Sequence, residues 1–333
     1  MGKPLPTFKA IALRENAFCE GHTLCPGCME SMTFNTIGRA TDNGRKTVFT
    51  MGTFCGEVST LMYPNVIAWG RNHHEPYDFE KSVGIIHNVF ESAPTVAEAV
   101  RDTADLLADT GAWRGPAPNV VALSGDGGAL SIGLRSLLHT IHRQARVAIF
   151  ININEVFANT GFQYSPTAIP YADSSTAPHG VGGEPIDHIG LTVVAGAAFV
   201  AQASPAFAPF FAEVVEEALA AEGTAVVFVP SPCIAGWKFE EGHTVDLGKL
   251  ASQTGLFPCF RKGRGQPGEI KNVPEKARRP PVERFLVGQR RFEHLVRLVG
   301  SEPAISPGHE SEVRAIQAFA DQNVERLGRI AQL

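Results

Sequence analysis

Three apolar stretches in the middle of the chain follow one another in a way that predicts secondary structure. Residues 120–123 are continuously apolar and end at a glycine-rich turn, which is typical of a short buried strand. Apolar residues then recur at helical spacing over residues 134–141, and residues 147–151 form a second apolar run. Because a helix joins two buried strands, we expect a strand–helix–strand crossover in a parallel sheet.

The same alternation continues downstream. Residues 209–221 predict a helix and residues 224–229 a strand, so residues from about 45 to 235 are expected to form one sheet. The predicted fold class is α/β, with a mostly parallel sheet flanked by helices. We divide the chain into a domain of residues 1–255, which holds these elements, and a C-terminal part of residues 256–333.

The C-terminal part differs in composition from the rest. Residues 261–291 hold ten basic and three acidic side chains, together with Pro and Gly, which predicts an extended arm. Helices are expected to follow from Val282 and from His309. A basic arm can bind nucleic acid, but this one lacks interleaved aromatic residues. We therefore expect it to wrap a partner subunit.

Composition places the chain among ordinary globular proteins. Its 333 residues are 44% hydrophobic and carry a formal net charge of −5, which argues against disorder and against a general nucleic-acid surface. No apolar run reaches the roughly 18 residues of a membrane helix. The N-terminus lacks a signal-peptide pattern. We expect a cytoplasmic protein that binds neither nucleic acid nor membrane.

The chemistry suggested by the sequence lies where the two central strands end. Asp126 follows the first strand and Asn154 the second, and a right-handed crossover brings both to one edge of the sheet. A carboxylate, an amide and a nearby backbone carbonyl are hard oxygen donors that suit Mg²⁺. Gly127 and Gly128 let the backbone approach a diphosphate, and the following helix offers free N–H groups.

The spacing of these residues makes the pattern more specific than a glycine turn, which many α/β proteins have. Between Gly127 and Asn154 lie 26 residues, and Asn159-Thr160-Gly161 follows. This arrangement resembles the thiamine-diphosphate motif. The alternative is an unrelated nucleotide-binding fold.

The chain has six cysteines, at positions 19, 25, 28, 55, 233 and 259. In a cytoplasmic chain they are expected to be reduced, metal-bound or catalytic. Cys25 and Cys28 form a CxxC pair, which by itself fits zinc, an iron–sulfur cluster or a redox dithiol. Cys55 and Cys233 could complete a four-thiolate cluster, although no local pattern decides this. The cysteines at positions 19 and 259 are assigned to burial.

A family resemblance connects these motifs. In chain order, GHTLCPGC, TFCGEVST, IIHNVFES, GDGG, NEVFANTGFQYSPT and SPC resemble the β chain of the 2-oxoacid:ferredoxin oxidoreductases, of which the pyruvate enzyme is the nearest type. The tail segment PVERFLVGQRRFEHL is also similar to that family. The resemblance implies a subunit that holds Mg²⁺, thiamine diphosphate and one 4Fe-4S cluster.

The resemblance also implies roles for individual residues. The implied cluster ligands are Cys25, Cys28, Cys55 and Cys233. The implied Mg²⁺ ligands are the side chains of Asp126 and Asn154 and the carbonyl of Val156. The residues implied to lie around the cofactor are Gly125, Gly127, Gly128, Asn159, Thr160, His22 and Cys55. Of these, Asn159 is the implied catalytic residue, next to the reacting carbon.

Three departures from the family pattern stand out. Ile153 replaces a common Asp or Asn, but it leaves the neighbouring Asn154 in place. Phe54 replaces a glycine before the third cysteine, which changes the packing expected beside the cluster. The segment of residues 65–85 is longer than expected. It is either an ordinary surface loop or a segment that shapes the substrate entrance or contacts a partner.

The implied activity is coenzyme A-acylating oxidative decarboxylation of a 2-oxoacid, with electrons passing through the 4Fe-4S cluster to ferredoxin or to further subunits. No second thiamine-type domain is evident in the sequence. We therefore expect an α subunit to supply the activating glutamate and substrate contacts. The chain has no CxxCxxCxxxC run, so further clusters are expected on a ferredoxin-like δ subunit, beside a γ subunit, or on a soluble ferredoxin.

Two other functions remain open. One is a thiamine-diphosphate decarboxylase or synthase without electron transfer, and the other is a non-catalytic iron–sulfur module that has lost the thiamine cofactor. The substrate also stays open. Pyruvate is the family default, and phenylglyoxylate or indolepyruvate would need only a wider pocket, for which Phe157, Phe162 and Tyr164 are candidate wall residues.

Overall fold

The computed structural model describes residues 6–18, 22–61 and 83–333. Its centre is an eight-stranded sheet in which the six strands from β7 to β2 are parallel, while β9 and β10 run antiparallel at one edge. In sheet order the strands are β10 (Glu269–Lys271), β9 (Cys259–Gly263), β7 (Phe199–Gln202), β8 (Ala225–Pro230), β4 (Ala148–Ile153), β3 (Asn119–Gly125), β1 (Thr47–Met51) and β2 (Val83–His87). The predicted α/β class is confirmed.

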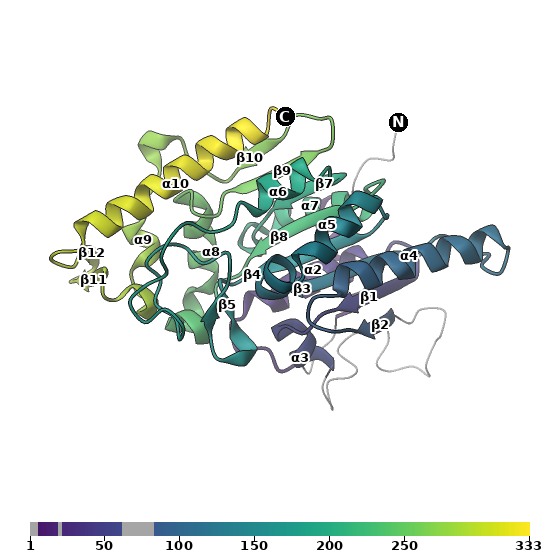
Figure 1. Ribbon diagram of the computed structural model, residues 1–333, viewed down its shortest axis with the longest axis horizontal. Helices are drawn as coiled ribbons and strands as arrows, with labels where there is room; N and C mark the ends of the chain where they lie inside the picture. Colours follow the sequence, from purple (N-terminus) through teal and green to yellow (C-terminus); the bar gives the residue numbers. More distant parts are fainter. Residues whose placement is uncertain (1–5, 19–21, 62–82) are drawn as a thin grey trace.

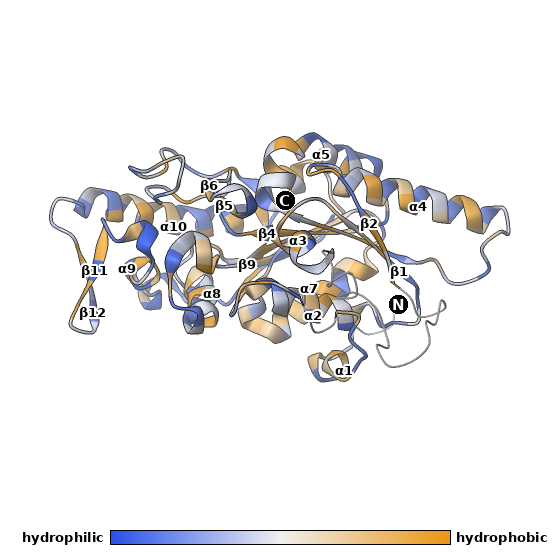
Figure 2. Cartoon of the chain, turned by 90° about the horizontal axis from the view of Figure 1, so that it is seen from below, coloured by the Kyte–Doolittle hydropathy of each residue, from blue (hydrophilic) through white to orange (hydrophobic). Residues whose placement is uncertain are grey.

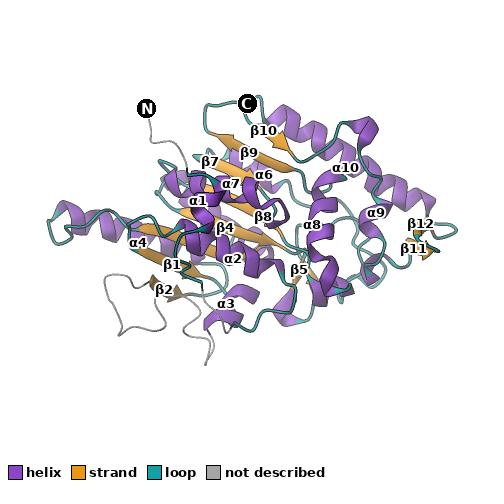
Figure 3. Ribbon diagram, turned by 180° about the vertical axis from the view of Figure 1, so that it is seen from behind, coloured by secondary structure: helices purple, strands orange, loops and turns teal. Residues whose placement is uncertain are grey.

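Helices cover both faces of this sheet. Figure 1 shows α4, α5 and α6 on one face, and Figure 3 shows α1, α2 and α7 on the other. The helices are α1 (Phe8–Ala12), α2 (Met29–Ala40), α3 (Cys55–Leu61), α4 (Ala93–Asp109), α5 (Leu134–Arg143), α6 (His188–Val194), α7 (Ala208–Ala220), α8 (Thr244–Gln253), α9 (Glu283–Leu286) and α10 (Glu310–Ile330). No helix among the described residues is long and apolar enough to cross a membrane.

The apolar residues of the central strands point alternately into two cores. Val120, Ile149 and Phe228 pack under α4 and α5, whereas their neighbours Phe150 and Val227 pack under α2 and α7. Because both faces are covered, these strands are mostly apolar, as parallel strands usually are. Figure 2 shows the hydrophobic residues gathered in the strands between the helix layers.

The predicted crossover is confirmed, with one addition. β3 and β4 pair in parallel, and α5 connects them. Between the glycine turn and α5, the backbone forms a π-type turn (Gly128–Ile132). The predicted helix at residues 209–221 and strand at 224–229 correspond to α7 and β8.

The chain after residue 255 is less extended than expected. Its basic segment begins with the hairpin of β9 and β10, which extends the same sheet. The helix expected from Val282 is only the four residues of α9, because Gly288 turns the chain with φ 82°. A 3₁₀ turn (Arg290–Phe292) and the hairpin of β11 (Val296–Val299) and β12 (Glu302–Ile305) follow before α10. The division at residue 255 stays a prediction.

Candidate functional site

Asp126 and Asn154 lie at the same edge of the sheet. The strand register pairs Gly125 of β3 with Asn152 of β4, so the next residues of both strands leave the sheet side by side. Both side chains line one cavity of about 300 Å³. The parallel topology therefore brings them together, as the sequence predicts, although their role as metal ligands stays a prediction.

The Asp126 carboxylate is fixed by hydrogen bonds on both oxygens. The Gly127 N–H donates to Oδ1 at 2.8 Å. Oδ2 accepts from the Glu155 N–H at 2.8 Å and from the hydroxyls of Ser165, at 2.7 Å, and Thr167. The side chain is buried, and burial raises the pKa of Asp126 to about 6, although these four hydrogen bonds oppose the rise. A bound cation would stabilise its charge.

The loop after β4 presents oxygen atoms near Asp126. The Asn154 side-chain oxygen accepts from the Val156 N–H at 3.1 Å, which fixes the amide orientation. The Asn154 carbonyl accepts from the Trp237 indole N–H at 2.9 Å. Val156 opens a short hairpin of β5 (Val156–Phe157) and β6 (Gln163–Tyr164) and lines the cavity. This donor set of carboxylate and amide oxygens fits Mg²⁺.

The glycines at the cavity wall have no room for a side chain. A Cβ on Gly127 would lie 2.4 Å from a ring carbon of Phe157. A Cβ on Gly128 would lie 2.9 Å from the Phe90 carbonyl oxygen and from Ser124 Oγ. The bare backbone at this wall fits the close approach of a diphosphate.

Asn159 joins the cavity to the cysteines. It lines the cavity with Thr160, and its side-chain oxygen lies 3.4 Å from the Cys55 thiol, which donates to it. Cys55 itself lines the same cavity. The thiamine-type motif and the third cysteine, 104 residues apart in sequence, therefore meet at one place.

The four cysteines predicted to hold a cluster come from three separate parts of the chain. Cys25 and Cys28 lie in the turn before α2, Cys55 begins α3, and Cys233 precedes a π-type turn (Ile234–Lys238). All four are free thiols. Burial raises the pKa of Cys233 to about 11, and the charges of Glu30 and Cys25 add to that rise. Burial also raises the pKa of Cys55, and the charges of Glu30 and then of Cys233 add to that rise.

The charges of the four predicted cluster ligands influence one another's pKa values, and their role as cluster ligands stays a prediction. Burial raises the pKa of Cys28, and the charges of Glu30, Cys233 and Cys55 add to that rise. Among the described residues, no three His, Cys, Asp or Glu side chains converge as ligands of a single metal ion. The ligands of a 4Fe-4S cluster bind separate iron atoms, so this single-ion criterion does not test a cluster held by the four cysteines.

Glu30 is a residue that the sequence analysis missed. It is buried at the start of α2, accepts a hydrogen bond from the Asn152 side chain, and its Oε2 has no hydrogen-bond partner among the described residues. Burial and the charge of Asp126 raise the pKa of Glu30 to about 8. The only sequence feature that could have indicated the buried partner Glu30 is Asn152, a polar residue within a buried and mostly apolar strand.

The remaining predicted residues are divided between this cavity and other parts of the chain. His22 stacks on Phe18, with ring centroids 5.1 Å apart, and is not among the residues that line the cavity. Cys259 is buried, as expected. Phe157 lines the cavity, whereas Phe162 lines a neighbouring one and Tyr164 lines neither. Cys19 and most of the 65–85 segment lie outside the described residues.

Comparisons with known proteins agree with this geometry. Residues 105–229 match the family described as "Thiamine pyrophosphate enzyme, C-terminal TPP binding domain". The chain is 34% identical to pyruvate synthase subunit PorB of Methanothermobacter marburgensis, over 84% of this chain and 91% of that protein. It is 24% identical to ketoisovalerate oxidoreductase subunit VorB of Pyrococcus abyssi, over 96% and 94%.

A solved structure shares the fold. A chain of the 2-oxoglutarate:ferredoxin oxidoreductase from Magnetococcus marinus superimposes with a TM-score of 0.53 and 21% identity, covering 70% of this chain and 79% of that one. The PorB match, which extends over most of both sequences, shows the family. This chain belongs to the thiamine-diphosphate-binding β subunits of the 2-oxoacid:ferredoxin oxidoreductase family.

Proposed function

We propose that this chain is the catalytic β subunit of a coenzyme A-acylating 2-oxoacid oxidoreductase. The complex would convert a 2-oxoacid and coenzyme A to acyl-CoA and CO₂ and pass the electrons to ferredoxin or to further subunits. One observation carries the proposal. The cavity lined by Asp126, Asn154 and Asn159 also includes Cys55, whose thiol contacts Asn159 at 3.4 Å. A decarboxylation site and an electron-accepting site are thus adjacent in one chain.

We infer that Asp126, Asn154 and the Val156 carbonyl hold Mg²⁺, and that Gly125, Gly127 and Gly128 give the diphosphate access to the backbone. The oxygen donors and the missing side chains at this wall support the assignment. These residues would hold thiamine diphosphate, which when bound would supply a nucleophilic carbon and an electron sink for decarboxylation. Phe54, Phe90 and Phe157 line the same cavity and give it an apolar wall.

We infer further that Cys25, Cys28, Cys55 and Cys233 hold the 4Fe-4S cluster. The contact of Cys55 with Asn159 and the electrostatic influence of the four thiols on one another support this assignment. Asn159 lines the cavity and contacts Cys55, so its amide would be available to hydrogen-bond to the substrate. The cysteines favour this redox function over a thiamine enzyme without electron transfer.

The need for partner subunits follows from the residue types that the described lining of the cavity lacks. Among its described lining residues Asp126 is the only acid, and no glutamate or arginine is present. An α subunit would therefore supply the activating glutamate and substrate contacts. Val89 and Ile132, from segments next to the cavity, are 63% and 58% exposed, as expected for residues that a partner covers. A γ subunit and a ferredoxin-like δ subunit, or a soluble ferredoxin, would complete electron transfer.

Pyruvate is the substrate that we favour, because the PorB relative is named as a pyruvate synthase subunit. The VorB relative is named for ketoisovalerate, and an aromatic acid such as phenylglyoxylate would fit the same chemistry. The test is a panel of 2-oxoacids given to the native complex with coenzyme A and a viologen dye.

We expect dye reduction and acyl-CoA formation that depend on coenzyme A, fastest with one acid. Aldehyde formation without dye reduction would instead show a non-redox decarboxylase. A complex that contains iron but binds no thiamine diphosphate would show an electron-transfer module. An Asp126→Ala complex serves as the control, because it should keep the cluster and lose turnover.

A further inference from the structure

Arg291 is a buried arginine whose partners lie in the cofactor loop. It belongs to the 3₁₀ turn Arg290–Phe292, in the C-terminal part of the chain, and its side chain is only 3% exposed. Its two terminal nitrogens bind both carboxylate oxygens of Glu155, at 3.0 and 3.1 Å. Its Nε donates to the Gln289 side chain at 2.9 Å. Such a two-pronged pair fixes orientation as well as charge.

Glu155 is the residue between Asn154 and Val156. Its backbone has φ 66°, a left-handed conformation that costs free energy in a non-glycine residue. Its N–H donates to Asp126, and its side chain accepts from the Ile169 N–H at 2.8 Å. Arg291 therefore neutralises the buried carboxylate that keeps this loop in its conformation.

Arg291 also contacts the turn that follows Cys233. Its guanidinium stacks over Trp237, 3.6 Å from the ring centroid. The Trp237 indole donates to the Asn154 carbonyl, and the Trp237 N–H donates to the Cys233 carbonyl at 2.8 Å. One guanidinium thus touches both loops, and Trp237 links them.

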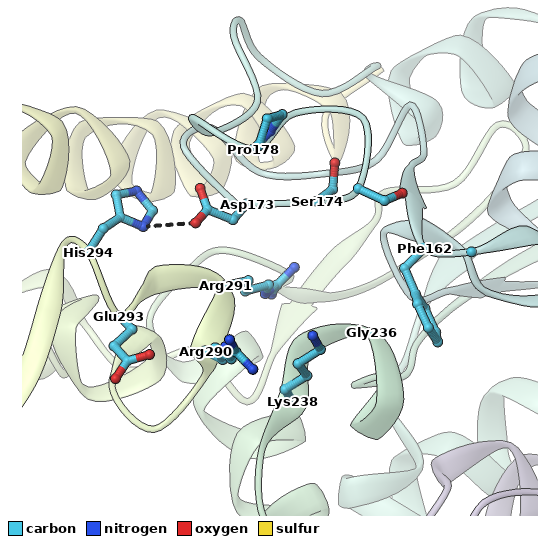
Figure 4. A pocket seen from close by; sticks show the side chains of 12 residues that line it. Phe162, Asp173, Ser174, Pro178, Gly236, Lys238, Arg290, Arg291, Glu293 and His294 are labelled. Atoms are coloured by element: carbon cyan, nitrogen blue, oxygen red, sulfur yellow. Dashed lines mark ion pairs between the residues drawn. The ribbon is translucent and has the colours of Figure 1, made fainter.

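Arg291 is not placed to bind a ligand of its own. It lines a cavity of about 600 Å³ with Arg290 and Lys238, shown in Figure 4. All three of its nitrogens already have protein partners. The same cavity is lined by the acids Asp173 and Glu293 as well as by cations, so its charge selects no ligand.

We propose that Arg291 is a positioning residue for both centres, holding the Asn154–Val156 loop through Glu155 and tying it to the Cys233 turn through Trp237. This inference rests on the proposed function. Partners behind metal ligands orient those ligands, and losing such a partner typically weakens metal binding by about 10- to 100-fold.

The test uses the native complex with Arg291→Met, Arg291→Lys and, as the matched control, Arg290→Met. The control removes a neighbouring exposed arginine that has no ion pair in the described part of the chain. Three quantities are measured: the dissociation constant of Mg²⁺–thiamine diphosphate after cofactor removal, the midpoint potential of the cluster, and the melting temperature.

We expect Arg291→Met to weaken cofactor binding by about 10- to 100-fold and to lower the midpoint potential, because a positive charge near Cys233 favours the reduced cluster. Arg291→Lys should be intermediate, since lysine keeps the charge but not the two-pronged pair. Arg290→Met should match the wild type.

A lower melting temperature with unchanged cofactor affinity and potential in Arg291→Met would show a purely structural arginine and overturn the inference. If that variant does not assemble, unchanged affinity in Arg291→Lys would overturn it equally. A wild-type complex that binds no thiamine diphosphate would instead refute the proposed function itself.

Discussion

Replacing Gly127 by alanine adds one methyl group at the wall of the thiamine cavity. The new Cβ would lie 2.4, 2.6 and 2.9 Å from three ring carbons of Phe157. An ordinary contact begins near 3.4 Å, so the ring must move by about 1 Å. That ring packs near Phe90, with centroids 6.0 Å apart, which limits its freedom. Overpacking of this kind costs about 1–3 kcal/mol.

Because Gly127 and Phe157 line the same cavity, the displaced ring changes the space that the cofactor needs. If the whole cost appears in binding, the dissociation constant of thiamine diphosphate rises by roughly 5- to 150-fold, since 1.4 kcal/mol is a factor of ten. The assay is cofactor titration of the stripped native complex at saturating Mg²⁺, followed by circular dichroism.

Gly328→Ala is the matched control. Gly328 lies within α10, and a Cβ there would meet nothing within 4 Å. Alanine in a helix interior should therefore stabilise the fold by about 0.5–1 kcal/mol without touching the cavity. Wild-type cofactor affinity in Gly127→Ala would refute the reasoning about this wall.

The other predictions concern the same site and the need for a partner subunit. Burial raises the pKa of Asp126 from 3.8 to about 6, and a raised acid pKa favours the protonated folded form, so the cofactor-free complex should lose stability as pH rises through this range. Mg²⁺ needs the ionised form, so its affinity, measured by calorimetry, should fall below about pH 6; a flat profile would contradict this. Trp237→Phe keeps an aromatic side chain but removes the indole N–H and leaves the Asn154 carbonyl unpaired. Denaturant titration should show that the free energy of unfolding falls by about 1–3 kcal/mol. The purified chain without partner subunits should not turn over any 2-oxoacid, and activity with a dye would disprove the need for an α subunit.

The central part of the fold could be predicted because its signals are local. The apolar runs of β3 and β4 and the helical spacing of α5 each lie within a few residues. Because β3 and β4 pair in parallel, Asp126 and Asn154 can be placed at one edge of the sheet even when no side-chain contacts are known. The grouping of the four cysteines rests on the family resemblance, because no sequence pattern near Cys233 connects it with Cys55.

The supporting contacts could not be predicted in this way. Glu30 meets Asn152 across 122 residues, and Arg291 meets Glu155 across 136. Each pair depends on how separate elements pack, which no periodicity records. The helix expected from Val282 was too long because Gly288 stops it. The basic segment after residue 260 predicts an arm because its strands are too short and too charged to give a strand pattern.

The central claim is that thiamine chemistry and a thiolate-bound cluster act together in this chain. Its most direct test follows the visible absorption of the cluster in the anaerobic native complex after a 2-oxoacid is added. We predict that the absorption bleaches, that a viologen acceptor restores it, and that an Asp126→Ala complex with the same iron content does not bleach. A wild-type cluster that keeps its absorption while CO₂ is released would contradict the account.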